Sequence, residues 1–138
     1  MNHKRDRRAR RGLATLETAL VLPLLLLLTF GVLEYGWMFW KLQDVTSATR
    51  HGARQAVLPD STTAGVEQAV ADMLADRGLG GTGYTIAFSP GDVMDAERAE
   101  AVRVTVRVPY SPVSLTNFRV LPMPEALEAS VTMAKEGP

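Results

Sequence analysis

The sequence predicts an α+β protein: a long N-terminal transmembrane helix continues outside the membrane and packs, with a short helix, on a small antiparallel sheet of about three strands. Two observations predict this fold. Residues 13–40 form an apolar run long enough to span a bilayer. Three later segments alternate apolar and polar residues with the period of two that half-buried strands require. At 138 residues, the chain has room for one modest domain beside the membrane segment.

Charge is distributed unevenly along a chain whose formal net charge is zero. Residues 1–12 contain six basic residues and one acid, which gives +5, and the remaining nine basic and fourteen acidic residues give −5. A basic leader before an apolar run predicts, by the positive-inside rule, that the N-terminus stays in the cytoplasm. We therefore expect a single membrane pass, with the C-terminal domain outside the cytoplasm.

The apolar run itself fits a membrane helix better than its alternatives. Residues 18–40 include a single charge, Glu34, over a length that exceeds the roughly 20 residues needed to cross a bilayer. Trp37 and Trp40, followed by Lys41, have the pattern of an interfacial aromatic belt with a snorkelling cation. The run is too long for the apolar region of a secretory signal, and it lacks the polar face of a soluble amphipathic helix.

Glu17 is an acid at the membrane-entering end of this helix. A charge at the bilayer centre costs roughly 2.5–3.5 kcal/mol on insertion scales, so such a residue predicts a function and a partner. If the chain were cut after Gly12, Leu13 would expose a new ammonium group, with which Glu17 at position i+4 could pair, in the same or a neighbouring copy. Alternatively, Glu17 lies at the headgroup boundary beside Arg10 and Arg11.

Three motifs in this part of the chain resemble a known family. The order of basic leader, Gly12, four residues, Glu17 and apolar helix resembles the type III signal of type IV pilins and pseudopilins. Residues 31–36 (GVLEYG) and 48–56 (ATRHGARQA) are similar to two segments of TadE-like proteins, the minor pilins of tight-adherence (Tad/Flp) systems. Together the motifs cover residues 11–56.

This resemblance implies a structural role rather than an enzymatic one. It implies a TadE-like minor subunit that contributes to assembly of a Tad-type pilus or secretion apparatus by packing of N-terminal helices. The implied partners are the lipid bilayer, a prepilin peptidase that cuts between Gly12 and Leu13, other pilin-like subunits and Tad assembly proteins. The implied location is the inner (cytoplasmic) membrane of a bacterium, with possible incorporation into a surface pilus. A different class stays open: an uncleaved single-pass anchor carrying an extracytoplasmic binding or sensing domain.

Two further features of the helix predict contacts. Ala48, Gly52 and Ala56 recur every four residues and form a stripe of small residues that lets another backbone approach closely. The partner is either the protein's own sheet, which we favour slightly, or a helix of another subunit. Glu34 is expected near the outer membrane interface, where it either faces water or makes a contact between subunits.

The domain organisation follows from breaks in the pattern. We expect a leader over residues 1–12, a transmembrane helix over 13–40, its extracytoplasmic continuation over 41–58 and a small α+β domain over 59–138. Within that domain, an amphipathic helix follows the break at Pro59 and stops at Gly78. The strands are predicted by alternation in the segments 84–88, 102–108 and 127–133.

Several functional classes are disfavoured by composition. The absence of cysteine excludes disulfides, thiol catalysis and zinc–thiolate sites. One histidine after the leader cannot supply a nucleophile–base–acid set, so we expect no enzyme and no cofactor. Asp92, Asp95, Glu97 and Glu100 lack the glycine and ligand order of an EF-hand and are expected to be solvated rather than to bind a metal. The acidic charge after the leader also disfavours nucleic acid as a partner.

Overall fold

The computed structural model describes residues 3–97, 100–116 and 121–135, except for the side chains of residues 3–14. The chain divides into two compact units, Met1–Gly36 and Trp37–Pro138. Helix α1 (His3–Ala56) runs through the first unit and begins the second. The predicted α+β class is confirmed, with an apolar N-terminal helix, a short helix and a three-stranded antiparallel sheet.

In the first unit, α1 presents an apolar surface. Residues 15–30 are all exposed, and an 18-residue window of the helix has a mean hydropathy of 2.2 with no residue buried. The core helix of a soluble protein would bury such a stretch, whereas lipid tails solvate it. Pro23 lies inside α1 without ending it, as is common in membrane helices. The helix is therefore long and apolar enough to cross a membrane once.

In the second unit, α1 buries one face. Val45, Thr49 and Ala53 are almost completely buried at a spacing of four residues, which is the periodicity of a helix with one face on a core. The helix ends at Ala56 because Leu58 precedes a proline and is pushed out of the helical region.

Helix α2 (Thr63–Asp76) begins and ends with local capping interactions. The Thr62 side chain accepts a hydrogen bond from the Gly65 N–H at 3.2 Å, which satisfies one of the free donors of the first turn. At the other end, Gly78 has a φ of 71° and Leu79 N–H donates to the Leu74 carbonyl at 2.8 Å. This is a Schellman motif, so the predicted helix stop at Gly78 is confirmed.

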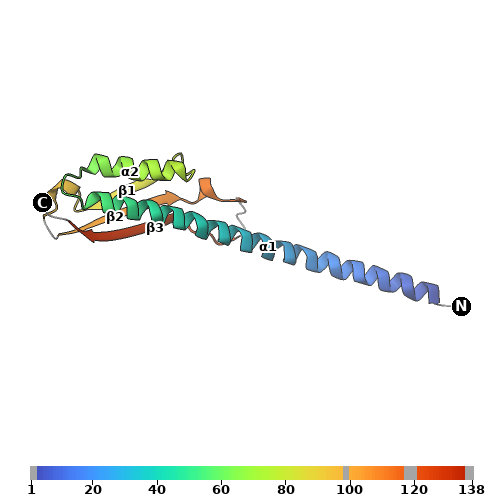
Figure 1. Ribbon diagram of the computed structural model, residues 1–138. Coiled ribbons are helices and arrows are strands. Elements are labelled where there is room, and N and C mark those ends of the chain that lie inside the picture. The colour runs from blue at the N-terminus through green and yellow to red at the C-terminus, as the bar shows by residue number, and fades with distance from the viewer. Residues whose placement is uncertain (1–2, 98–99, 117–120, 136–138) are drawn as a thin grey trace. The chain divides into compact units, whose positions relative to one another are not determined.

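The three strands pair in the order β1-β2-β3, antiparallel throughout (Figure 1). They are β1 (Thr85–Ser89), β2 (Ala101–Pro109) and β3 (Ala126–Ala134). In the central strand Val104 is buried while its neighbour Arg103 is exposed, which is the alternation expected of a sheet with one wet face. Two 3₁₀ turns, η1 (Val93–Asp95) and η2 (Ser111–Val113), lie in the connections.

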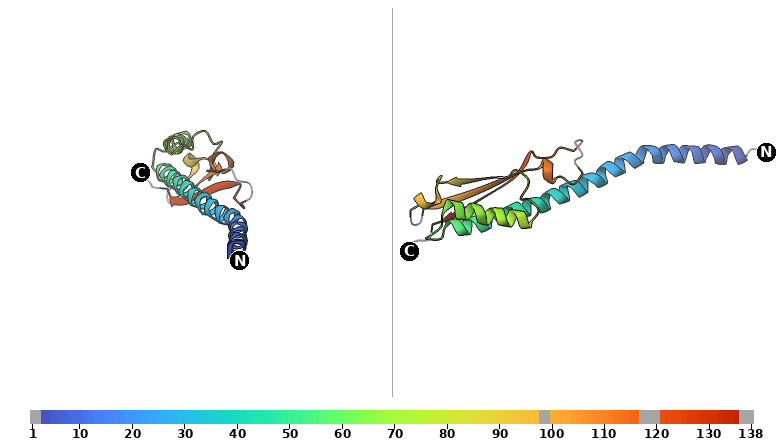
Figure 2. Two further views of the ribbon diagram at one scale, coloured as in Figure 1. Left: turned by 90° about the vertical axis from the view of Figure 1, so that its right-hand side faces the viewer. Right: turned by 90° about the horizontal axis from the view of Figure 1, so that it is seen from above.

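The second unit is a two-layer structure. Figures 1 and 2 show α2 and the last turns of α1 side by side over the same face of the sheet. The core between the layers is made of small and β-branched side chains, with partly buried Ile86, Phe88, Val131 and Met133 around it. Its buried members are Ala53, Ala56, Val57, Val66, Val93, Ala96, Val102 and Val104.

Candidate assembly site

The predicted cleavage point, Gly12–Leu13, lies inside α1. The side chains of both residues lie outside the described part of the chain. Glu17 is described, and its side chain is exposed on the same surface as the apolar residues around it, such as Leu20, which is 80% exposed. One helical turn of about 6 Å separates Glu17 from Leu13, and residues four apart share a helix face. A pair between the carboxylate and a Leu13 amine is therefore compatible with the helix.

Glu34, the second predicted assembly residue, is buried. Only 1% of its surface is exposed, and its side chain takes part in an interaction. A water-facing carboxylate, one of the two expectations for this residue, is therefore not what the structure shows. Burial of an acid is costly unless polar groups compensate it, so Glu34 is a constrained position rather than a free surface charge. The contact between subunits, the other expectation, stays a prediction.

The stripe of small residues is buried inside the second unit. Ala48 and Ala56 have no exposed surface, and a Cβ added at Gly52 would lie 2.3 Å from Cγ2 of Val70 and 3.7 Å from Cγ1 of Val104. Gly52 is therefore the point where α1 approaches α2 and β2 too closely for any side chain. The structure gives the stripe a contact with the protein's own domain, which is the partner that we favoured slightly from the sequence.

An ion-pair cluster joins α1 to the end of α2. Asp44 is buried, and its carboxylate accepts a 2.6 Å hydrogen bond from the Arg77 guanidinium and lies 3.6 Å from the Lys41 ammonium. Lys41 also donates to the Arg77 carbonyl at 3.0 Å. The sequence analysis did not find this cluster, because Asp44 and Arg77 are 33 residues apart and meet only through the packing of the two helices.

The aromatic residues next to this cluster are used in two different ways. Trp37 is partly buried, and its indole N–H donates to the Val113 carbonyl oxygen at 2.7 Å. The Lys41 ammonium lies 5.2 Å from the centre of the Trp37 ring. Trp40, by contrast, is 62% exposed. Trp37 and Lys41 thus pack on the domain, and their place at the membrane interface, like that of the exposed Trp40, stays a prediction.

A buried cation holds the far end of α1. Lys135 is only 8% exposed, and its ammonium donates to the Ala56 carbonyl at 3.1 Å, the Ser61 hydroxyl at 2.8 Å and the Val93 carbonyl at 3.4 Å. A cation at a helix C-terminus satisfies free carbonyls and interacts favourably with the helix dipole. The sequence analysis missed Lys135, since a single lysine after a strand carries no signal of burial.

The acids of the 92–100 loop have local structural roles. Asp92 accepts hydrogen bonds from the Thr63 hydroxyl at 2.6 Å and the Met94 N–H at 3.0 Å, and these bonds hold the pKa of its carboxyl below the usual range. Glu100 accepts from the Glu97 N–H at 2.9 Å. Among the residues that the structure describes, no group of three or more acids or histidines could hold a metal ion.

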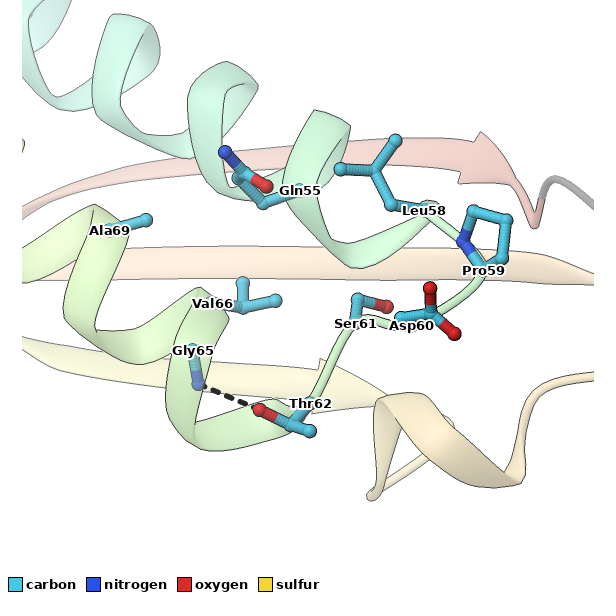
Figure 3. A pocket seen from close by; sticks show the side chains of 9 residues that line it. All are labelled: Gln55, Leu58, Pro59, Asp60, Ser61, Thr62, Gly65, Val66 and Ala69. Carbon is cyan, nitrogen blue, oxygen red and sulfur yellow. Dashed lines mark hydrogen bonds between the residues drawn. The ribbon is translucent and has the colours of Figure 1, made fainter.

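A groove of about 500 Å³ lies between the end of α1 and the start of α2 (Figure 3). Its lining is mostly apolar or uncharged, with one ionisable side chain, Asp60. The lining residues are Gln55, Leu58, Pro59, Asp60, Ser61, Thr62, Gly65, Val66 and Ala69. The Ser61 and Thr62 hydroxyls also line the groove; the Ser61 hydroxyl donates to the Ala56 carbonyl at 2.8 Å and the Thr62 hydroxyl caps α2. These hydroxyls are therefore used in local structure, at the end of α1 and the start of α2.

These features define a class: a pilin-like protein with an apolar, exposed N-terminal helix that continues into a small α+β domain. Residues 12–54 match the model of the family described as TadE-like protein, which confirms the family suggested by the three motifs. The match suggests a pilin-like protein associated with Tad pili, and the TadE-like family is structural rather than catalytic. No curated protein and no solved structure matches the chain.

Proposed function

We propose that this protein is a minor, TadE-like subunit that contributes to assembly of a Tad-type pilus or secretion apparatus. The observation that carries the proposal is the exposed apolar part of α1, with Glu17 near its start, inside the segment that matches the TadE-like family. A surface of this kind is stable only in lipid or against other apolar helices. The helix crosses the inner membrane of a bacterium, with the N-terminus in the cytoplasm and the domain from residue 41 onward outside the cytoplasm.

The proposed mechanism begins with processing. A prepilin peptidase removes the +5 leader after Gly12, and Leu13 becomes the new N-terminus. The Leu13 ammonium and the Glu17 carboxylate then neutralise each other, in one chain or between two neighbouring chains. Two opposite charges in a low-dielectric bundle attract strongly, whereas either charge alone is costly to bury. Release of the leader thus converts a precursor that is anchored in the membrane by its helix into a subunit that can join a helix bundle.

The remaining predicted assembly residues act further along the helix. Glu34, which is buried in this chain, is the candidate for a contact between subunits near the outer end of the membrane segment. Ala48, Gly52 and Ala56 act on assembly through the fold, because their contacts with α2 and the sheet hold the domain on the helix that enters the bundle. The partners of the protein are accordingly the bilayer, the peptidase, other pilin-like subunits and Tad assembly proteins.

The test uses Glu17→Ala in cells that contain the peptidase and the partner subunits. We expect the variant to insert and to be cleaved, because the pair forms only after cleavage, but to fail to co-purify with its partners. Glu17→Asp, with a shorter reach, should recover an intermediate amount. Thr18→Ala is the matched control, since it removes a neighbouring polar group without changing charge. Equal recovery of wild type and Glu17→Ala would refute the proposed role of the carboxylate.

A further inference from the structure

Two exposed helix faces in the second unit carry opposite charge. On α1, Arg50, His51 and Arg54 are exposed and form a basic ridge. The acid within residues 37–56 of this helix, Asp44, is buried against Arg77. The outward face of α1 is therefore basic over its last two turns.

The outward face of α2 is acidic. Asp72 and Asp76, four residues apart, are exposed on one side of α2 and form an acidic ridge, and the sequence of α2 contains no basic residue. Glu67 is also exposed, but it lies on the opposite side of the helix from Asp76. In the part of the chain that the structure describes, neither Asp72 nor Asp76 forms an ion pair with Arg50 or Arg54; Asp72 accepts a 2.7 Å hydrogen bond from the Gln68 side-chain amide. The acidic and basic ridges are thus not neutralised by each other within one chain, although the helices that carry them are neighbours (Figure 1).

The geometry points to a second copy of this chain as the partner of these ridges. We propose that the basic ridge of one copy docks on the acidic ridge of the next. This rests on the proposed function, in which copies stand in the same orientation. In that orientation α1 of one copy runs antiparallel to α2 of its neighbour, because α1 and α2 are antiparallel within a chain: Gly52 lies against Val66 and Val70, while Asp44 meets Arg77.

The spacing of the charges fits this arrangement. Arg50 and Arg54 are four residues apart, as are Asp72 and Asp76, so both pairs are separated by about 6 Å along their helices. Antiparallel docking brings Arg54 to Asp72 and Arg50 to Asp76. Such exposed pairs give register and specificity more than affinity, so helix packing supplies most of the binding and the ridges select the neighbour.

The same distances predict a stagger between copies. Within one chain, the middle of the arginine pair lies opposite residues 66–70 of α2, and the middle of the aspartate pair lies about six residues further along α2. Docking therefore displaces the neighbouring copy by roughly 9 Å along the helix axis. Two different faces meet in each contact, so the interface is heterologous and repeats from copy to copy instead of closing at a dimer.

The test uses thiol cross-linking of the full chain, which has no natural cysteine, with a reagent that carries a spacer. Positions 51 and 75 of neighbouring copies lie level with each other along the helices in the staggered arrangement, one on each side of the contact line, so their Cβ atoms are roughly 10 Å apart. Both side chains are exposed. The variant His51→Cys/Ala75→Cys, treated in native membranes with a bismaleimide whose spacer is roughly 10 Å long, should form a ladder of multimers, because each copy offers one position to each neighbour. A product that stops at the dimer, or cross-links only to a different protein, would overturn the proposal.

Charge reversal then tests the ridges. Adding Arg50→Glu and Arg54→Glu should reduce the ladder at least about fivefold, and adding Asp72→Arg and Asp76→Arg to the same chain should restore it. The ladder should also weaken in about 1 M salt, where the screening length is about 3 Å. The matched control reverses two exposed arginines on the outer face of the sheet, Arg103→Glu and Arg107→Glu, and should leave the ladder unchanged.

Restoration by the swapped pair shows that the reversed chain folds, so a loss without restoration would overturn the proposal. The two proposals fail separately. Normal co-purification of Glu17→Ala with a charge-dependent ladder would refute the role of Glu17 and keep the ridge contact. Loss of assembly in Glu17→Ala, with a ladder that charge reversal does not change, would support the role of Glu17 and refute the ridge contact.

Discussion

Replacement of Gly52 by alanine tests how α1 is held on its domain. The new Cβ would lie 2.3 Å from Cγ2 of Val70, well below the distance of an ordinary contact between carbon atoms. Val70 has no exposed surface, and its branched side chain is stiff, so it cannot turn away without moving its neighbours. The variant must therefore separate α1 from α2 or distort the core.

The expected loss of stability follows from two opposing effects. Overpacking of a filled core costs about 1–3 kcal/mol, and replacing a glycine inside a helix with alanine regains about 0.5–1 kcal/mol. The net loss is about 1–2 kcal/mol. For a domain of this size, each kcal/mol lowers the Tm by about 4–8 °C, so we expect a decrease of about 5–15 °C.

The assay is thermal unfolding of the full chain in detergent, followed by the fluorescence of Trp37 and Trp40. Gly36→Ala is the matched control, because no atom lies within 4 Å of the Cβ that it would add on the same helix. Val70→Ala added to Gly52→Ala should make the pair less destabilised than the sum of the single changes. An unchanged Tm for Gly52→Ala, with loss of co-purifying subunits, would mean that Gly52 packs on another subunit instead.

Three further outcomes are expected. Lys135→Met should lower the free energy of unfolding by about 1–3 kcal/mol, because it removes the hydrogen bonds of the buried ammonium to the Ala56 and Val93 carbonyls and the Ser61 hydroxyl. Arg107→Met on the exposed sheet face should change it by less than about 0.5 kcal/mol, and equal effects would contradict the role of Lys135. Because the pKa of Asp92 is lower in the folded protein than its ordinary value of 3.8, its carboxylate stabilises the fold at pH values above 3.8, and this stabilisation is lost as the pH falls through the folded pKa. Asp92→Asn should therefore flatten the pH dependence of the free energy of unfolding between about pH 5 and pH 2. A pH profile identical to that of the wild type would refute this role of Asp92. A periplasm-active reporter fused after Pro138 should be active, and activity of a cytoplasmic reporter at that position would contradict the proposed topology.

Elements with local signals were predictable from the sequence. Strand β2 was found because valines alternate with polar residues over its length, and the structure extends it by one residue at each end. The end of α2 was predictable because glycine readily adopts the positive φ that ends many helices, and Gly78 has this conformation in the structure. Both signals depend on near neighbours in the chain, so they survive without knowledge of the tertiary fold.

Contacts between distant residues were not predictable in the same way. Asp44 and Arg77 meet because α1 and α2 lie antiparallel on one sheet, and neither residue has a local pattern that marks it as paired. Lys135 reaches the end of α1 only because β3 ends beside it. Trp37 was assigned to the membrane interface from its aromatic neighbours, but its hydrogen bond to Val113 depends on a loop 76 residues away.

The central claim is that this chain is a processed, pilin-like subunit rather than a permanent single-pass anchor. Intact-mass analysis of the protein purified from membranes, with and without co-expressed prepilin peptidase, tests this claim most directly. With the peptidase, the account predicts a form that begins at Leu13 and has lost the leader, residues 1–12; without it, the full chain should persist. A protein that keeps residues 1–12 in the presence of the active, matching peptidase would contradict the account and favour an uncleaved anchor with a binding or sensing domain.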